Sequence, residues 1–92
     1  MEVLERVDPW IKAAEDFLWT AEILMTMGRY AQAFMLACHA LNLCKRGKAP
    51  FERAPKECVE LIFPRGDLTP EDLVTQELAE RIIKETKECL GL

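Results

Sequence analysis

Residues Ala14 to Cys44 read AEDFLWTAEILMTMGRYAQAFMLACHALNLC, and small side chains recur through this stretch at helical spacing. Ala33, Ala37 and Ala40 lie three or four positions apart, so on a helix they form one narrow stripe. Gly28 interrupts the pattern at the point where one helix would end and the next begin. Because small side chains let helix backbones approach closely, the stretch predicts a tight helical hairpin.

Length and composition indicate one small globular domain over residues 1–92. Half of the residues (50%) are hydrophobic and 30% are charged, a balance that argues against disorder. No apolar run reaches the roughly 18 residues that a membrane span needs. Residues 1–10 show no basic start followed by an apolar stretch, so we expect no secretion signal, no membrane association and a cytoplasmic location.

Several local signals predict an all-α fold, an up-and-down bundle of three long helices and one short helix. Asp8 followed by Pro9 is typical of a helix start, and the hairpin is expected over 9–46. The segment GKAPFERAP that follows is predicted to be a loop, because it contains one glycine and two prolines. No segment shows the period-two alternation of a β-strand over a useful length.

Two more helices are expected in the second half of the chain. Residues 56–63 are predicted to form the short helix. Thr69, Pro70 and Asp72 resemble a capping box with proline at the first position, so the last helix is expected over 70–90 and Gly91 should end it.

The four cysteines are expected to be reduced thiols, because a cytoplasmic setting disfavours disulfides. On one helix Cys38 and Cys44 would point about 120° apart, so these two cannot share a metal ion. The chain also lacks a C-x2-C pair. We therefore predict that Cys38, Cys44, Cys58 and Cys89 are small core residues, with no metal site and no cofactor.

The hairpin and the end of the chain carry a family resemblance. The residues on which it rests in the hairpin are Ala14, Asp16, Ala21, Leu24, Gly28, Tyr30, Ala33, Ala37 and Ala40. This pattern resembles the first two helices of HEPN domains, small all-α proteins that follow A-x-D-x4-A-x2-L-x3-G-x-Y-x2-A-x3-A-x2-A. The stretch FPRGDLTPEDLVTQELAERIIKETKECL is similar to the family's C-terminal part, where an Arg–aromatic–Pro turn precedes a T-x-E-D start and a final helix. The resemblance spans roughly Trp10 to Leu90.

A tetratricopeptide repeat is the alternative for the same hairpin. The spacing of such a repeat is also met by Gly28, Tyr30, Ala33, Ala40 and Leu41, with Ala21 in its small-residue position. Repeats of this kind need several copies to bury their faces, and no second copy follows in the chain. We therefore favour the HEPN-like interpretation.

The HEPN resemblance implies a ribonuclease motif that the chain lacks. Active members are similar to metal-independent ribonucleases with an Arg, four to six intervening residues and a His that acts as acid or base. The one histidine is His39, and no Arg lies four to six residues before it. Arg65 lies in the family's Arg–aromatic–Pro region, but Gly66 replaces the aromatic residue and no His follows. We expect no catalytic residue, and a divergent ribonuclease is the alternative.

The resemblance also implies partners. Members of the family usually form homodimers and act beside a minimal nucleotidyltransferase, often as a toxin–antitoxin pair. Met35, Leu36 and Leu43 lie off the alanine stripe and need cover, so together with His39 they are the predicted dimer interface. A histidine that is partly buried and hydrogen-bonded to Asn42 or to the backbone is the simpler role for His39.

A basic segment is the best candidate for binding. Lys45, Arg46, Lys48 and Arg53 lie close together, with Lys56 just beyond, on a chain whose formal net charge is −4. Lys45 and Arg46 have a structural explanation, since cations stabilise the C-terminal end of a helix. With Phe51 among them, these cations would alternatively bind nucleotide or RNA phosphates, or a protein partner with an acidic surface. Arg65 is a further candidate phosphate ligand.

Overall fold

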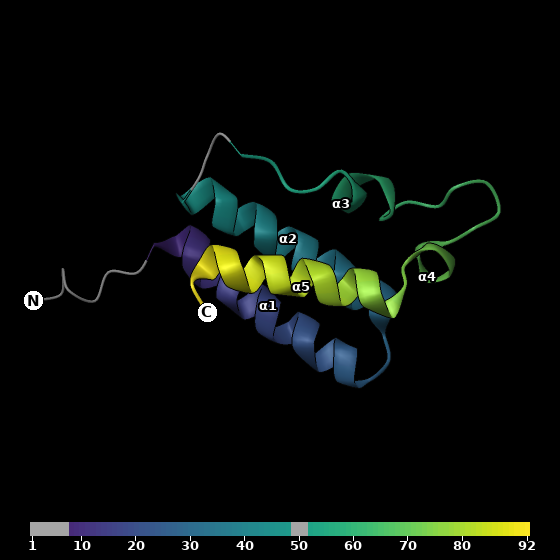
Figure 1. The fold of residues 1–92 in the computed structure, drawn as a ribbon, viewed down its shortest axis with the longest axis horizontal. Helices are drawn as coiled ribbons and strands as arrows, with labels where there is room; N and C mark the ends of the chain where they lie inside the picture. The colour runs from purple at the N-terminus through teal and green to yellow at the C-terminus, as the bar shows by residue number, and fades with distance from the viewer. Residues whose placement is uncertain (1–7, 49–51) are drawn as a thin grey trace, which may run out of the picture.

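The computed structural model describes residues 8–48 and 52–92, and this part of the chain is helical with no β-strand (Figure 1). The all-α prediction is confirmed for these residues. The helices are α1 (Pro9–Thr26), α2 (Tyr30–Lys48), α3 (Glu57–Glu60), α4 (Pro70–Leu73) and α5 (Gln76–Leu90). Three of them are long, and α3 and α4 are single turns.

Local capping sets the ends of the hairpin. The Asp8 carboxylate accepts a hydrogen bond from the Trp10 backbone N–H at 2.8 Å, which satisfies one of the free donors at the start of α1. Gly28 has a φ of +74°, a left-handed conformation that a side chain would disfavour, and it turns the chain from α1 into α2. The chain then runs back antiparallel along α1 (Figure 1).

Five alanines of α1 and α2 are fully buried, and these two helices make the most extensive contact between helices in the described part of the chain. Ala14 and Ala21 on α1 and Ala33, Ala37 and Ala40 on α2 are all fully buried. Their small side chains leave the two helix backbones close together. The larger core side chains, among them Phe34 and Leu41 of α2, belong to the same buried cluster as Ile82 of α5.

Helix α5 lies across the hairpin and contacts α2 more extensively than α1 (Figure 1). Ile82 is fully buried there, and so is the polar side chain of Thr86. The Thr86 hydroxyl lies 2.8 Å from the Ile82 carbonyl oxygen in its own helix and 3.2 Å from the Ala37 carbonyl oxygen in α2. The buried hydroxyl therefore has partners in both helices, and its desolvation is compensated.

The hairpin ends later than the sequence predicted. We expected α2 to end at Arg46 and a loop to begin at Gly47, but α2 continues to Lys48. A Cβ atom at Gly47 would lie 3.0 Å from Ile11 Cδ1 and 3.2 Å from Trp10 Cβ. Gly47 is therefore a point of close approach between α2 and the start of α1, and not a helix stop.

The two predictions for the second half of the chain need correction. The short helix expected over 56–63 is one turn, α3, because residues 61–63 bend away. The helix expected over 70–90 is broken between α4 and α5, where Val74 and Thr75 are extended. Thr75 caps α5 by accepting a hydrogen bond from the Leu78 backbone N–H at 3.1 Å, and Val74 is buried in the core.

The expected capping box at the start of α4 is present. The Asp72 carboxylate accepts hydrogen bonds from the Thr69 backbone N–H at 2.9 Å and from the Thr69 hydroxyl at 3.0 Å. These bonds hold the pKa of Asp72 below its ordinary value of 3.8, because they stabilise the charged form. Gly91 ends α5 in the left-handed conformation, with a φ of +80°.

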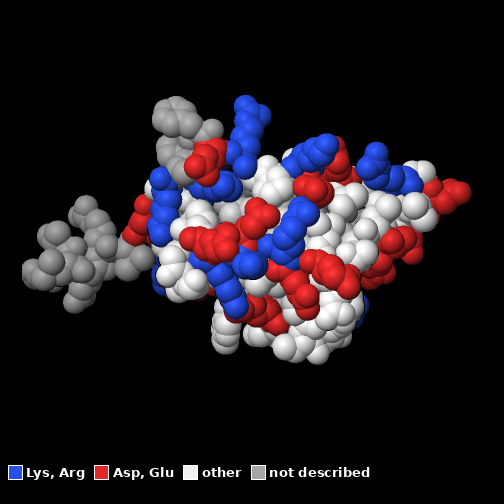
Figure 2. Space-filling model, viewed as in Figure 1, with Lys and Arg blue, Asp and Glu red and all other residues white. Residues whose placement is uncertain are grey.

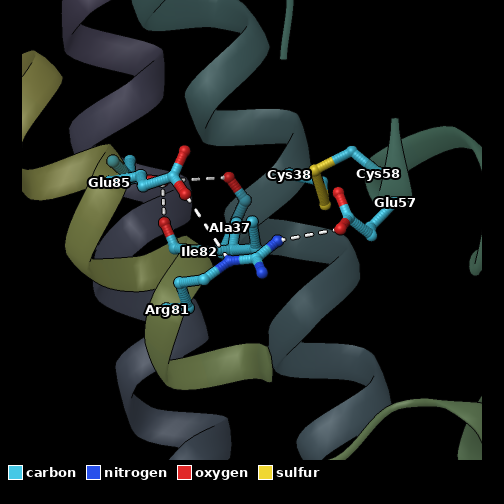
Figure 3. Close-up of a disulfide and its surroundings, with 8 residues drawn as sticks. Ala37, Cys38, Glu57, Cys58, Arg81, Ile82 and Glu85 are labelled. Carbon is cyan, nitrogen blue, oxygen red and sulfur yellow. Dashed lines mark hydrogen bonds and ion pairs between the residues drawn. A yellow bond between two sulfur atoms is a disulfide. The ribbon is translucent and has the colours of Figure 1, made fainter. Parts of the chain in front are cut away.

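The expectation that the cysteines are reduced thiols is wrong for this structure. Cys38 of α2 is bonded to Cys58 of α3, and Cys44 of α2 is bonded to Cys89 of α5, with Cα–Cα distances of 5.4 Å and 6.4 Å (Figure 3 shows the first). Disulfides are typical of oxidising compartments and of intracellular proteins from hyperthermophiles. The cysteines therefore do not support the expected cytoplasmic location.

The alanine contact gives the first prediction. Replacing Ala37 with Leu adds three carbons at a fully buried position of the core, and we expect the free energy of unfolding to fall by about 1–3 kcal/mol or more. For a domain of this size, each 1 kcal/mol corresponds to roughly 4–8 °C in melting temperature. Ala13→Leu, the same enlargement at a half-buried alanine of α1, is the control and should lower stability less. An A37L protein as stable as the control would contradict close packing at this contact.

The disulfides give the second prediction. In the loop-closure description, bonds that span 20 and 45 residues stabilise the fold by about 3 and about 4 kcal/mol. We expect a reductant to lower the melting temperature markedly. Peptide mapping of the unreduced protein should recover the pairs Cys38–Cys58 and Cys44–Cys89. Titratable thiols in the denatured, unreduced protein, or any other pairing, would contradict the structure.

Candidate anion-binding groove

The end of α2 and the chain that follows it form a groove of about 580 Å³. From α2, the groove is lined by Asn42, Lys45 and Arg46. The segment that returns alongside α2 supplies the other side. Its lining residues are Glu52, Arg53, Ala54, Lys56, Val59 and Glu60.

Four basic side chains and two carboxylates line this groove, so its formal charge is positive although the chain is acidic. Lys45 is mostly covered, and its ammonium group donates a hydrogen bond to Glu52 at 2.9 Å. Arg46, Arg53 and Lys56 are exposed. Figure 2 shows basic side chains gathered along the edge that carries α3, beside a face over α5 where acidic and basic side chains are mixed.

The positive charge of the groove comes from side chains and not from the backbone. The carbonyl end of a helix carries a partial negative charge, so the end of α2 by itself disfavours an anion. Lys45 and Arg46 lie in or near the last turn, where they offset this charge and stabilise the helix. Only the cations from the returning segment, Arg53 and Lys56, lack this structural explanation.

Arg46 forms a boundary between two grooves. Its guanidinium carbon lies 5.6 Å from the centroid of the Trp10 ring, within the range of a cation–π contact. A second groove of about 430 Å³ lies on the Trp10 side and is lined by Trp10, His39, Asn42, Leu43 and Arg46. The stacked indole reduces the freedom of the Arg46 side chain at the edge of the basic groove.

One disulfide and one ion pair fix the returning segment to the bundle. The Cys38–Cys58 disulfide joins α3 to the middle of α2. Beside it, Arg81 of α5 lies between two carboxylates, 3.2 Å from Glu57 and 3.6 Å from Glu85 (Figure 3). A hydrogen bond from its own backbone N–H, and then Arg81, hold the pKa of Glu57 below its ordinary value of 4.5.

The structure brings together three of the five predicted phosphate ligands, Lys45, Arg46 and Arg53. Lys48 lines a neighbouring groove with Lys45 and Glu52, where Glu85 and Glu88 of α5 make the surroundings acidic. Arg65 is not in the basic groove: it lies in a turn closed by two backbone hydrogen bonds between Arg65 and Leu68. Phe51 lies outside the described residues.

The predicted dimer residues differ in how much surface they offer. Met35 is 40% exposed and His39 is exposed, but Leu36 and Leu43 are half-buried and pack against the core of their own chain. The His39 ring lies edge-on to Phe17, with ring centroids 4.6 Å apart. The hairpin therefore covers part of the apolar surface that the sequence left without a partner.

Sequence reasoning missed several residues of the basic groove. Asn42 precedes Lys45 and Arg46 by three and four positions, so the helical period places it on the same side of α2. Val59 and Glu60 reach the groove because the disulfide holds α3 against α2, and no local pattern predicts this.

Within 8–48 and 52–92, no group of three or more His, Cys, Asp or Glu side chains is arranged to hold a metal ion. In that same part of the chain, no helix is long and apolar enough to cross a membrane. Comparison of the chain with protein-family models, with curated proteins and with solved structures finds no match.

The lowered pKa values of Glu57 and Asp72 give a prediction for acid stability. Each carboxylate has a lower pKa in the folded state, so its stabilising effect is present above its ordinary value and is lost as the pH falls through the folded value. We expect the free energy of unfolding to decline as the pH falls below 4.5, because of Glu57, and to decline further below pH 3.8, because of Asp72.

Urea unfolding between pH 7 and about pH 3 measures this effect. In Glu57→Gln the carboxylate is gone, so the fall with pH should be shallower, whereas Glu15→Gln, at an exposed residue in the interior of α1, is the control. Equal pH dependence in E57Q and the wild type would contradict the lowered pKa of Glu57, which its backbone N–H and then Arg81 produce.

Proposed function

We propose that the basic groove binds phosphate groups of a nucleotide or of single-stranded RNA, and that the protein is a binding module. The observation that carries the proposal is the convergence of Lys45, Arg46, Arg53 and Lys56 on one groove, from two segments of an acidic chain. A solvated surface needs no such gathering of like charges, because like charges destabilise one another.

The chemistry of the lining suits phosphate. Arginine presents a planar fork of donors that matches phosphate oxygens, and lysine binds them as a point charge. Asn42 adds a neutral donor and acceptor beside these cations. A groove of about 580 Å³ is in the size range of small-molecule sites, so it can hold a mononucleotide or one unit of a longer strand.

Binding is favoured over catalysis because the residues of the expected ribonuclease motif are not together. His39 lies against Phe17 on the hairpin, whereas Arg65 lies in the turn between α3 and α4. A divergent ribonuclease remains the alternative, and it predicts cleavage of RNA that depends on His39.

A second proposal rests on the HEPN resemblance. The alanines at the family positions are fully buried at the contact of α1 and α2, and Gly28 has the left-handed conformation, which supports a hairpin of this kind. We propose a catalytically incomplete HEPN-like module that forms a homodimer and acts beside a minimal nucleotidyltransferase, in the manner of a toxin–antitoxin pair. A tetratricopeptide-like interaction hairpin is the alternative, because it fits the same positions.

Co-expression tests the second proposal. A minimal nucleotidyltransferase from the neighbouring gene should elute with this chain in one complex on gel filtration. Separate elution at micromolar concentration, or the absence of such a gene beside this one, would count against the partnership and leave the groove proposal untouched.

The groove proposal predicts a defined salt dependence. We expect a fluorescent oligouridylate to bind with a log–log salt slope of about −2, since Arg46, Arg53 and Lys56 would each neutralise one phosphate at about 0.7 per contact. Arg53→Gln should weaken binding and reduce the slope by about 0.7, as measured by fluorescence anisotropy at several salt concentrations.

Arg65→Gln is the matched control, because it removes the same charge outside the groove. It should leave both affinity and slope unchanged. Equal losses in R53Q and R65Q would show that binding follows net charge and not the groove, and no binding of the oligouridylate or of ATP would contradict the proposal.

A further inference from the structure

The Cys38–Cys58 disulfide joins the two sides of the basic groove (Figure 3). On the α2 side, Arg46 follows Cys38 by eight positions, which is about two helical turns. On the other side, Cys58 comes two residues after Lys56. The bond holds the two backbones close, with a Cα–Cα distance of 5.4 Å. It therefore sets how near the segment that supplies Arg53 and Lys56 lies to α2.

Helix α3 cannot keep this position by its own structure. It is a single turn, Glu57–Glu60, and a helix this short is not stable in water by itself. Its N-cap residue, Lys56, makes no capping hydrogen bond through its side chain. Among the helices that the structure describes, α2 and α3 make the least extensive of the contacts. The position of α3 therefore depends on links outside its own turn.

The noncovalent links to the returning segment are weak or undirected. Glu52 pairs with Lys45 at 2.9 Å and Glu57 pairs with Arg81 at 3.2 Å, but Glu52 and Arg81 are 64% and 48% exposed. Ion pairs in contact with water add little to stability. Three half-buried apolar side chains of the segment pack on the core, and these are Ala54, Leu61 and Ile62. Because apolar contact is not directional, it keeps the segment near the bundle without fixing where its cations lie.

The second disulfide, Cys44–Cys89, joins elements that pack together without it. It links α2 to α5, and these two long helices share one buried core. The Thr86 hydroxyl of α5 also donates to the Ala37 carbonyl oxygen of α2 at 3.2 Å. Neither cysteine of this bond is among the described residues that line the basic groove. The second disulfide is therefore an internal control for effects of the first.

We propose that Cys38–Cys58 is a redox switch that regulates the phosphate binding proposed above, on which the switch depends. With the bond formed, Arg53 and Lys56 are held in the groove beside Arg46. With the bond reduced, the single turn of α3 unfolds and these two cations leave the groove. The cations of α2 remain, but they lie at the negative end of that helix, so the reduced protein binds phosphate weakly.

The reductant is a dithiol, a protein or small molecule with two neighbouring thiols. Its first thiolate attacks one sulfur atom of the disulfide, the sulfur–sulfur bond breaks, and the other sulfur leaves as a thiolate that takes a proton from water. The second thiol of the reductant then displaces the remaining sulfur from the mixed disulfide. Two electrons and two protons thus reach Cys38 and Cys58, which become thiols, and the reductant becomes a disulfide.

Phosphate binding and the redox state are linked. Both cysteines are only 3% exposed, so attack on the bond needs local opening of α3, which a bound phosphate opposes. A ligand that binds the oxidised form more tightly by some factor shifts the reduction equilibrium by the same factor. A tenfold difference in affinity corresponds to about 30 mV in the two-electron reduction potential.

Fluorescence anisotropy with the fluorescent oligouridylate tests the switch on two matched variants. Cys38→Ala with Cys58→Ala removes the switch and keeps the other disulfide, and Cys44→Ala with Cys89→Ala does the reverse. We expect the first variant to bind about tenfold or more weakly than the oxidised wild type, since one hydrogen bond to a charged group contributes about that factor. Its log–log salt slope should be shallower by about 1.4, because two phosphate contacts are lost.

The second variant should bind as the oxidised wild type does. Dithiothreitol should weaken its binding, because Cys38–Cys58 is its remaining disulfide, and should leave the first variant unchanged. Circular dichroism checks that both variants stay helical.

A measurement on the wild type applies even where a variant does not fold. In a buffer of reduced and oxidised dithiothreitol, saturating inorganic pyrophosphate should shift the ratio of reduced to oxidised Cys38–Cys58 about tenfold toward the bond. Alkylation of free thiols followed by peptide mapping reads this ratio for each disulfide separately. The ratio for Cys44–Cys89 should stay the same.

The remaining outcomes separate the switch from the groove. Equal affinity of the two variants, or equal protection of both disulfides by pyrophosphate, would overturn the switch and leave the groove proposal standing. An oxidised wild type that binds neither oligouridylate nor pyrophosphate would remove phosphate binding itself, and the switch with it.

Discussion

The close contact between α1 and α2 is the constraint on which the rest of the structure depends. Five alanines with no exposed surface lie in this hairpin, and they share one core with larger side chains such as Phe34 and Leu41 of α2 and Ile82 of α5. Gly47 extends the same contact to the far end of the hairpin, where a side chain would meet Trp10 and Ile11. The hairpin is therefore narrow along its whole length, and every other element packs on it.

The basic groove follows from this arrangement together with one covalent link. Because α2 runs to Lys48, its last turn extends beside the returning chain, and the Cys38–Cys58 bond holds that chain close. Arg53 and Arg46 are thereby brought to one groove from two segments. The cations must overcome the negative end of a helix, so affinity for phosphate depends on these particular side chains.

Signals confined to a few residues could be predicted from the sequence, and contacts between distant segments could not. Asp8 and Gly28 act through their immediate neighbours, and the structure has the predicted cap and turn at both. Glycine commonly ends a helix, but α2 continues through Gly47. The close approach of α1 explains why a glycine is placed there. The pairing of Cys38 with Cys58 likewise depends on where α3 returns, and the number of cysteines does not reveal it. For the same reason the grouping of Lys45, Arg46 and Arg53, which are close in the sequence, could be predicted. The position of Arg65 outside the basic groove depends on the fold and could not.

The most direct test of the basic groove is a nuclear magnetic resonance titration of the isotopically labelled protein with inorganic pyrophosphate. The backbone amide signals of the residues that line the groove should shift together with one dissociation constant; these are Asn42, Lys45, Arg46, Glu52, Arg53, Ala54, Lys56, Val59 and Glu60. Arg65 and Leu68, which lie in a separate turn, should not shift. Shifts spread over all basic residues, or centred on Arg65, would contradict the account.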